Sequence, residues 1–183
     1  MSLAYLELLE VHHRRSVWLK GHDYTRGIYF VTISAKNREC LFGTIENTKV
    51  KLNEYGKIIK EEWLQTQHMR SNIKLGEFVI MPNHFHAIIQ LKPSLLSRGT
   101  MHCAPTEDAE FSHIVKQSLG AIMRGFKSSV TERIRKLPGG YEGHFWQRNY
   151  YEHLIRSSNE LEQIRTYISE NPQKWDRDRE NIT

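Results

Sequence analysis

The stretch MPNHFHAIIQL, from Met81 to Leu91, decides the fold of this 183-residue chain. Pro82-Asn83 is turn chemistry, and the residues that follow are of the apolar, aromatic and β-branched kinds that favour a strand. Successive side chains of a strand point to opposite faces, so His84 and His86 share one face and Phe85 points to the other. Two neighbouring imidazoles can supply two nitrogens to a metal ion. The plainer alternative is a pair of half-buried polar residues.

The rest of the chain predicts further strands and helices around this strand, from turn residues, capping residues and apolar periodicity. In chain order they are a strand over Gly27–Ala35, a hairpin over Leu41–Leu52, a helix capped by Asn53, a strand over Asn72–Met81, the strand His84–Leu91, a long helix from Phe111 to Ile134, a strand within His144–Ile155 and a helix from Ser157 to Asn171. A polar, charged tail is expected to follow Pro172.

This order is the ferredoxin-like pattern, an α+β fold in which the first and third main strands lie in the middle of an antiparallel sheet. The third strand is the one that carries the two histidines. Two helices are expected to cover one face of the sheet. The other face is expected to be open, with the C-terminal helix lying over it as the catalytic helix.

Composition limits the class of protein. A chain of 183 residues with 39% hydrophobic residues can form one domain over 1–183. It has no run of about 18 apolar residues and no signal-peptide layout at its start, so we expect no membrane association. Cys40 and Cys103 form neither a metal-type spacing nor a disulfide framework, which indicates a cytoplasmic protein. The net charge of +5 permits a polyanionic partner.

Positive charge gathers in two parts of the chain. The first is the region of about residues 1–25, which we interpret as a basic arm, and the second is the long helix. Between them, the loop of about 92–110 is rich in Pro, Ser and Gly and is predicted to be a mobile surface loop. The polar side of the long helix is either a solvated face or a surface that follows phosphates. Its charged residues are Lys116, Arg124, Lys127, Arg133, Arg135, Lys136 and one acid, Glu132.

The last helix offers a second half for the histidine site. Tyr167 and Asn171 are four residues apart, so they lie on one helix face about 6 Å apart along the axis. If the helix crosses the open face, Asn171 can give its carbonyl oxygen to the ion and the Tyr167 phenol lies beside a bound phosphate. Two imidazoles and an amide oxygen suit Mn²⁺ or Mg²⁺. The alternative for Tyr167 is an ordinary packing role.

A nucleophilic tyrosine makes chemical sense for phosphoryl transfer on nucleic acid. The ordinary pKa of the phenol is about 10, so it must be activated at neutral pH. A cation on the scissile phosphate both stabilises the transition state and favours the phenolate. The covalent phosphotyrosine that results keeps the bond energy for rejoining, which a simple hydrolase does not need.

Several short segments, weak singly, are specific in their order and spacing. They are Phe30-Val31-Thr32-Ile33, Glu39-Cys40-Leu41-Phe42-Gly43, His84-Phe85-His86, Gly125-Phe126-Lys127-Ser128, the run Trp146–His153, and Tyr167-Ile168 with Asn171-Pro172. Together they resemble the REP-associated tyrosine transposases, which belong to the HUH single-tyrosine transposases. The resemblance covers most of the chain.

The resemblance implies a metal-dependent single-stranded DNA endonuclease and strand transferase. Such enzymes act in DNA transposition at hairpin-forming repetitive palindromes through a 5′-phosphotyrosine. Carried over by position, His84 and His86 are the metal-binding pair, Asn171 is the third ligand and Tyr167 is the nucleophile. The implied cofactor is Mg²⁺ or Mn²⁺, and the implied partner is single-stranded or hairpin DNA, bound by a monomer or homodimer in the cytoplasm near the nucleoid.

Four residues are candidates for DNA contact. Trp146 and Arg148 suit base stacking and phosphate contact, with core packing as the alternative for Trp146. Arg124 and Lys127 of the long helix are the next candidates for phosphate contacts.

Two other assignments stay open. Tyr150 and Tyr151 compete with Tyr167 as nucleophile, although a strand position lacks a ligand partner one turn away. The chain is alternatively a DNA-binding regulator without catalysis, or a phosphohydrolase of small nucleotides whose activity does not depend on Tyr167.

Overall fold

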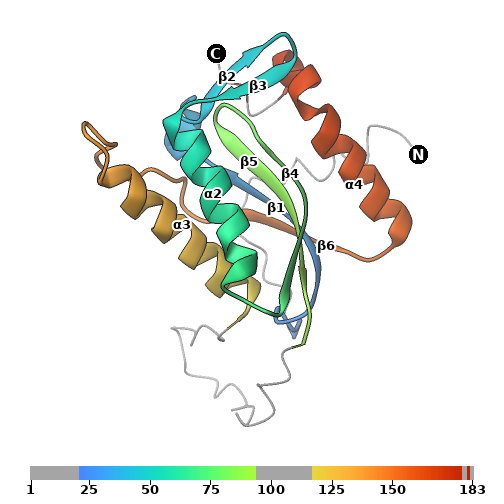
Figure 1. Ribbon diagram of the computed structural model, residues 1–183. Helices are drawn as coiled ribbons and strands as arrows, with labels where there is room; N and C mark the ends of the chain where they lie inside the picture. Colours follow the sequence, from blue (N-terminus) through green and yellow to red (C-terminus); the bar gives the residue numbers. More distant parts are fainter. Residues whose placement is uncertain (1–20, 94–116, 179–180, 182–183) are drawn as a thin grey trace.

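The computed structural model describes residues 21–93, 117–178 and 181, and its centre is a four-stranded sheet in the order β4-β5-β1-β6 (Figure 1). These strands are β1 Gly27–Ser34, β4 Ile73–Ile80, β5 His84–Leu91 and β6 Tyr151–Ile155. All three pairings are antiparallel. The first and third main strands, β1 and β5, lie in the middle. The predicted α+β, ferredoxin-like arrangement is confirmed.

Helices cover both faces of the sheet. Figure 1 shows α2 (Glu54–His68) and α3 (Leu119–Arg135) on one side of the sheet and α4 (Ser158–Glu170) on the other. Asn53 caps α2 by accepting a hydrogen bond from the Gly56 N–H, as the sequence predicts. Ser157 caps α4 through the Glu160 N–H at 3.2 Å, which is also the predicted cap. The C-terminal helix therefore lies over the sheet face opposite α2 and α3.

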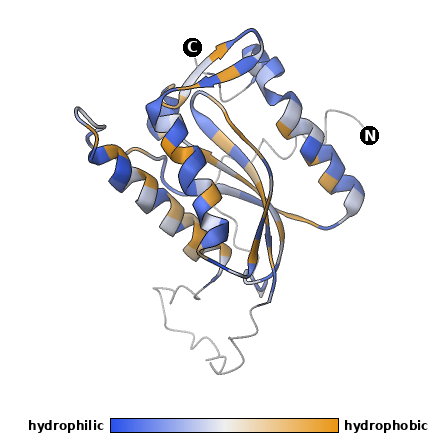
Figure 2. Cartoon of the chain, in the orientation of Figure 1, coloured by the Kyte–Doolittle hydropathy of each residue, from blue (hydrophilic) through white to orange (hydrophobic). Residues whose placement is uncertain are grey.

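The alternation along β5 divides its side chains between the two faces. Phe85 has no exposed surface and packs under α2 and α3, with ring centroids 5.0 Å from Trp63 and 5.7 Å from Phe126. In Figure 2 both helices carry hydrophobic and hydrophilic bands, as expected for helices with one face against a sheet. His84 and His86 point to the α4 side, as predicted from the strand period.

A smaller apolar cluster docks α4 on the sheet. Ile164 and Ile168 of α4 are 1% and 3% exposed and pack with Phe30, Ile88 and Ile155 from the strands. Burying an isoleucine side chain contributes about 1.5–3 kcal/mol, so these two residues stabilise the docked position of the helix. This contact, with the ion pair between Arg165 of α4 and Glu77 of β4 at 3.0 Å, positions α4 and therefore Tyr167.

The sheet face that carries the histidines is not open, contrary to the expectation from sequence. His84 is 0% and His86 3% exposed. The chain continues after α4 as the 3₁₀ helix η3 (Asn171–Arg177) and returns toward the histidines, where a free polar tail was expected. Pro172 ends α4 as predicted but also begins this turn of 3₁₀ helix.

The remaining elements lie at the edges. The predicted hairpin is formed by β2 (Gly43–Glu46) and β3 (Lys49–Leu52), and a short 3₁₀ helix, η1 (Lys36–Arg38), follows β1. Most of the basic arm (residues 1–20), most of the 92–110 loop and the Phe111 end of the long helix lie outside the described residues. In the described part of the chain, no helix combines the length and the apolar character that crossing a membrane requires.

Candidate active site

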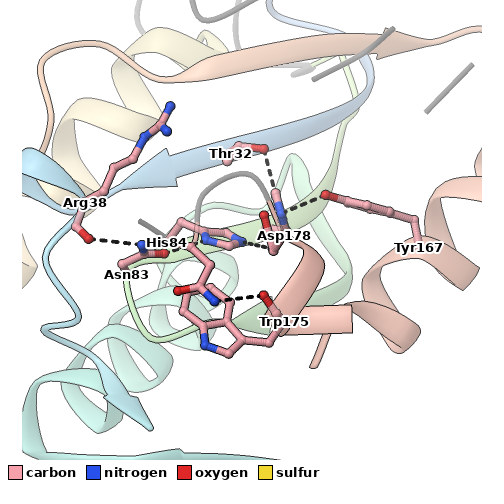
Figure 3. A network of polar contacts seen from close by, with 9 residues as sticks. Thr32, Arg38, Asn83, His84, Tyr167, Trp175 and Asp178 are labelled. Atoms are coloured by element: carbon pink, nitrogen blue, oxygen red, sulfur yellow. Dashed lines mark hydrogen bonds and ion pairs between the residues drawn. The ribbon is translucent and has the colours of Figure 1, made fainter. Parts of the chain in front are cut away.

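The hydroxyl of Tyr167 lies beside the ring of His86. The distance from Tyr167 Oη to His86 Nε2 is 3.3 Å, and the two ring centroids are 5.3 Å apart (Figure 3). Tyr167 stands on the last turn of α4, next to the buried Ile168, so the helix that packs on the sheet also delivers the phenol. Phe30 of β1 packs against both rings: its ring centroid is 6.0 Å from that of Tyr167 and 5.2 Å from that of His86.

Thr32 holds the other side of the His86 ring. Its Oγ1 lies 2.8 Å from His86 Nδ1, because Thr32 of β1 is the direct cross-strand partner of His86 in β5. Burial lowers the pKa of His86 to about 3, so the imidazole is neutral near pH 7. A neutral ring with a fixed orientation is the form that binds a metal ion.

His84 is oriented by its neighbour in sequence. Asn83 donates its amide N–H to the Arg38 carbonyl at 3.0 Å, so the Asn83 oxygen faces His84 and accepts from Nδ1 at 2.8 Å. Burial, with His86 and then Arg38, lowers the pKa of His84 well below its ordinary value, and only the Asn171 side chain opposes this. The Nε2 of His84 is therefore the nitrogen that is available as a ligand.

Asn171, the predicted third ligand, lies at the start of η3. Its side chain is 4% exposed, and among the described residues its Oδ1 has no hydrogen-bond partner; the same is true of His84 Nε2. Leaving a polar atom buried without a partner costs about 1–3 kcal/mol, and a cation between such atoms removes that cost. The donor set of two imidazoles and an amide oxygen therefore fits Mn²⁺ or Mg²⁺.

Side chains of the strongest ligand types do not form a metal centre by themselves. In residues 21–93, 117–178 and 181, no group of three or more His, Cys, Asp and Glu has the arrangement to hold an ion. The further donor that the described residues offer beside the histidine pair is of a weaker type, the amide oxygen of Asn171. An amide ligand argues against zinc, which takes Cys, His and carboxylate ligands.

Two of the four DNA-contact candidates have structural roles. The ammonium group of Lys127 donates to the carbonyls of Gln147 and Asn149 at 2.8 and 2.9 Å, and burial lowers its pKa to about 8. Trp146 is 7% exposed, and its indole N–H donates to the Lys127 carbonyl at 3.1 Å. These contacts favour core packing for Trp146 and tie α3 to the segment before β6.

The other two candidates, Arg124 and Arg148, are exposed. Arg124 is on α3, which covers the sheet face opposite the histidines, so the structure does not bring it together with Tyr167. Arg148 lies in the segment that leads into β6. Both guanidinium groups are accessible to a phosphate backbone that reaches around the edge of the sheet.

The competing tyrosines are divided between the two faces. Tyr150 packs against the core under α2 and α3, and burial together with the Glu152 charge raises its pKa far above the ordinary value. Tyr151 packs with the cluster that contains Tyr167. Its position on β6 places it two strands from His86, with β1 between them. Tyr151 thus remains the competing nucleophile that an experiment must separate from Tyr167.

Sequence reasoning missed three polar residues at the site: Thr32, Asn83 and Asp178. Thr32 is two residues after Phe30, which lies on the histidine face, so strand alternation places Thr32 on the same face. This alternation is the sequence signal that could have identified Thr32. Asn83 carries only the signal of a turn residue. Asp178 sits in the charged run DRDRE, where nothing in the sequence indicates a buried carboxylate.

Comparison with known proteins finds a relative that covers most of the chain. An uncharacterized protein of Haemophilus influenzae is 39% identical over 169 residues, which are 92% of this chain and 93% of that protein. The chain belongs to the same family as this Haemophilus protein. No family model matches the chain.

Transposases are more distant relatives of the chain. A second Haemophilus influenzae protein, named "Putative REP-associated tyrosine transposase", is 25% identical over 83% of this chain and 74% of its own length. A solved structure of a REP-associated tyrosine transposase bound to a REP hairpin has a TM-score of 0.55 at 21% identity, covering 84% of this chain and 71% of that one. This structural similarity shows that the chain shares the fold of that transposase.

Proposed function

We propose that this protein is a metal-dependent, single-stranded DNA endonuclease and strand transferase that uses Tyr167 as its nucleophile. The observation that carries the proposal is the 3.3 Å distance between the Tyr167 hydroxyl and His86, at the point where His84 and Asn171 leave two buried polar atoms without hydrogen-bond partners in the described part of the chain. The distant relationship to a REP-associated tyrosine transposase supports the same reaction class.

The reaction joins the phenol oxygen to phosphorus. The Tyr167 oxygen loses its proton and attacks the scissile phosphate, the bond from phosphorus to the 3′-oxygen breaks, and that oxygen takes up a proton. The products are a 5′-phosphotyrosine and a free 3′-OH. In strand transfer a 3′-OH attacks the phosphotyrosine, which restores a phosphodiester and releases Tyr167.

His84, His86 and Asn171 would hold the divalent cation. When bound, Mg²⁺ or Mn²⁺ supplies positive charge that polarises the phosphate and lowers the proton affinity of the phenol. The protein contributes orientation, because Thr32 and Asn83 fix the two rings and the apolar contacts of α4 fix Tyr167.

The proposed substrate is a hairpin-forming single strand with a cleavable flank. A REP-associated tyrosine transposase binds a REP hairpin in its solved structure, and we extend that substrate class to this chain. Arg124 and Arg148 are the exposed residues that we propose for phosphate contacts. Lys127 and Trp146, which are engaged inside the protein, are not included.

The test is formation of a covalent protein–DNA adduct. Hairpin-bearing oligonucleotides and Mn²⁺ are incubated with the wild-type protein, Tyr167→Phe and Tyr151→Phe, and the products are separated under denaturing conditions. We expect an adduct for wild type and Tyr151→Phe and none for Tyr167→Phe. An adduct that survives in Tyr167→Phe and disappears in Tyr151→Phe would move the nucleophile to β6. Binding of hairpins without cleavage by any variant would favour a regulator, and phosphate release from small nucleotides that is independent of Tyr167 would favour a phosphohydrolase.

A further inference from the structure

A pocket lies beside α3, the helix that covers the sheet face opposite the candidate active site (Figure 1). Its lining includes Trp146, from the segment before β6, and, from the second half of α3 and its C-cap, Lys127, Ser128, Glu132, Arg135 and Lys136. Its volume of about 560 Å³ is that of a small-molecule site and exceeds the space that a single phosphate group fills. The pocket can therefore hold an organic ligand of about the size of a nucleotide.

The charge of the pocket is positive. Lys127, Arg135 and Lys136 bring three cationic groups to its lining, whereas Glu132 brings one carboxylate. The Nζ of Lys136 lies 2.6 Å from Oε1 of Glu132, so the charges of these two side chains offset each other. Lys127 and Arg135 leave the pocket with a net positive charge, which favours a ligand that carries a phosphate.

Arg135 can contact an anion from the rim of the pocket. Its side chain is exposed, and its Nη2 donates to the Gly143 carbonyl at 2.9 Å. A guanidinium carries five N–H groups, so this hydrogen bond orients the side chain and leaves further N–H groups for a phosphate. The hydroxyl of Ser128, which is also exposed, adds a neutral donor about two helical turns away on the same pocket lining.

Lys127 and Trp146 form a fixed wall of the pocket. The Lys127 ammonium is held by the carbonyls of Gln147 and Asn149, and the Trp146 indole N–H donates to the Lys127 carbonyl at 3.1 Å. With a pKa of about 8, lowered by burial, Lys127 is still mostly cationic near pH 7. The wall offers charge and apolar surface at set positions before a ligand arrives, which limits the entropy that binding costs.

We propose that this pocket binds one unpaired nucleotide of a DNA strand, with the phosphate beside Arg135 and the base against the wall formed by Lys127 and Trp146. The nucleotide must be unpaired, because a base that is stacked and paired in a duplex cannot enter a pocket. The inference rests on the single-stranded DNA substrate proposed above. It adds a second point of contact on the other side of the sheet, so this nucleotide is not the one that Tyr167 would attack.

The experiment measures binding by the full-length protein in the presence of a chelator, so that no cleavage competes. Thymidine 5′-monophosphate is titrated by nuclear magnetic resonance, and a hairpin oligonucleotide with or without a single-stranded flank by fluorescence anisotropy. Arg135→Gln removes a charge, whereas Ser128→Phe fills the pocket at unchanged net charge. Both variants should bind the mononucleotide and the flanked hairpin about tenfold more weakly than the wild type, and the hairpin without a flank with nearly unchanged affinity.

Arg156→Gln is the matched control, because it removes an exposed arginine between β6 and α4, outside the pocket. It should bind all three ligands as the wild type does, and circular dichroism should show the three variants folded. Wild-type affinity for the flanked hairpin in Arg135→Gln and Ser128→Phe would overturn the inference, and weaker mononucleotide binding alone would assign the pocket to free nucleotides. An equal loss in Arg156→Gln would also overturn it. A wild-type DNA adduct with unchanged binding in the pocket variants would refute the pocket alone, and pocket-dependent binding without an adduct would refute the nuclease alone.

Discussion

The Thr32 hydroxyl orients the ring of His86. It is 2.8 Å from Nδ1 on the neighbouring strand. In Thr32→Val, which keeps the shape of the side chain, His86 Nδ1 loses this partner. We expect a stability loss of about 1–3 kcal/mol and a fall in Mn²⁺ affinity of about 10–100-fold.

Urea unfolding and calorimetric titration with Mn²⁺ measure these two effects. Thr131→Val is the control, because its hydroxyl bonds the Lys127 carbonyl within α3 on the opposite side of the sheet. That variant should keep its Mn²⁺ affinity. An unchanged affinity in Thr32→Val as well would show that the orientation of His86 does not matter for the ion.

Burial of His86 makes the stability of the metal-free protein depend on pH. The folded protein protonates His86 only near pH 3, whereas the unfolded chain does so near 6.5. The stability linked to this group is complete above pH 6.5 and is lost as pH falls toward 3. At pH 5 the loss is about 2 kcal/mol by linkage.

The comparison of wild type with His86→Gln isolates this contribution. Unfolding by urea at pH 7 and pH 5, in the presence of a chelator, should show a smaller loss of stability in His86→Gln than in the wild type. His68→Gln, with its ring exposed at the end of α2, is expected to behave as the wild type does. A wild-type stability that does not change between the two pH values would mean that His86 is not held in a dry, neutral state.

At the scale of the elements, two helical glycines differ in what surrounds them. A Cβ at Gly56 of α2 would collide with the Phe42 carbonyl, which is held by the Asn53 N–H at 3.1 Å. At Gly125 of α3 the nearest atom is the flexible end of Arg70, at 3.1 Å. Thermal unfolding should show Gly56→Ala destabilised by about 1–3 kcal/mol and Gly125→Ala stabilised by about 0.5–1 kcal/mol. If both variants are stabilised by similar amounts, helix propensity alone determines the change in stability. The Phe42 carbonyl would then move away from the new Cβ at little cost in free energy.

The sequence predicts the regular elements of this protein better than its site. The alternation in β5 and the apolar stripe of Ile164 and Ile168 are periodic signals, and they place the histidines, α4 and Tyr167. Asp178 has no such signal, because its burial depends on the path of η3 after Pro172. The expectation of an open face failed for the same reason: a segment without apolar periodicity covers it.

At the scale of the whole molecule, positive charge and the candidate chemistry lie on different parts of the surface. The histidine pair and Tyr167 are on the α4 side of the sheet, whereas α3 carries its basic residues on the opposite side. A nucleic acid that contacts both must reach around the sheet, and Arg148 lies in the segment that leads into the edge strand β6. Binding strength and cleavage should therefore be separable by mutation.

This separation gives a prediction for Arg148→Ala and Arg124→Ala. Each removes an exposed positive charge, so the affinity for a hairpin oligonucleotide should fall, and the slope of log affinity against log salt should decrease by about 1 for each lost phosphate contact. Fluorescence anisotropy at several salt concentrations measures both quantities. The stability of the variants should be unchanged, because substitutions of exposed residues without buried contacts have little effect on it.

Arg133→Ala is the matched control on the same helix. Its guanidinium pairs with Glu61 at 2.6 Å and Glu62 at 2.9 Å, so it joins α3 to α2 rather than facing solvent alone. Loss of this arginine should reduce stability, because Glu62 is 9% exposed and would lose its partner, and should leave the salt slope unchanged. If the slope of log affinity against log salt falls equally in Arg124→Ala, Arg148→Ala and Arg133→Ala, DNA binding depends on the net charge of the protein. It would then not depend on specific contacts with Arg124 and Arg148. No change in any of the three variants would place the DNA contacts elsewhere, on surfaces that include neither α3 nor the approach to β6.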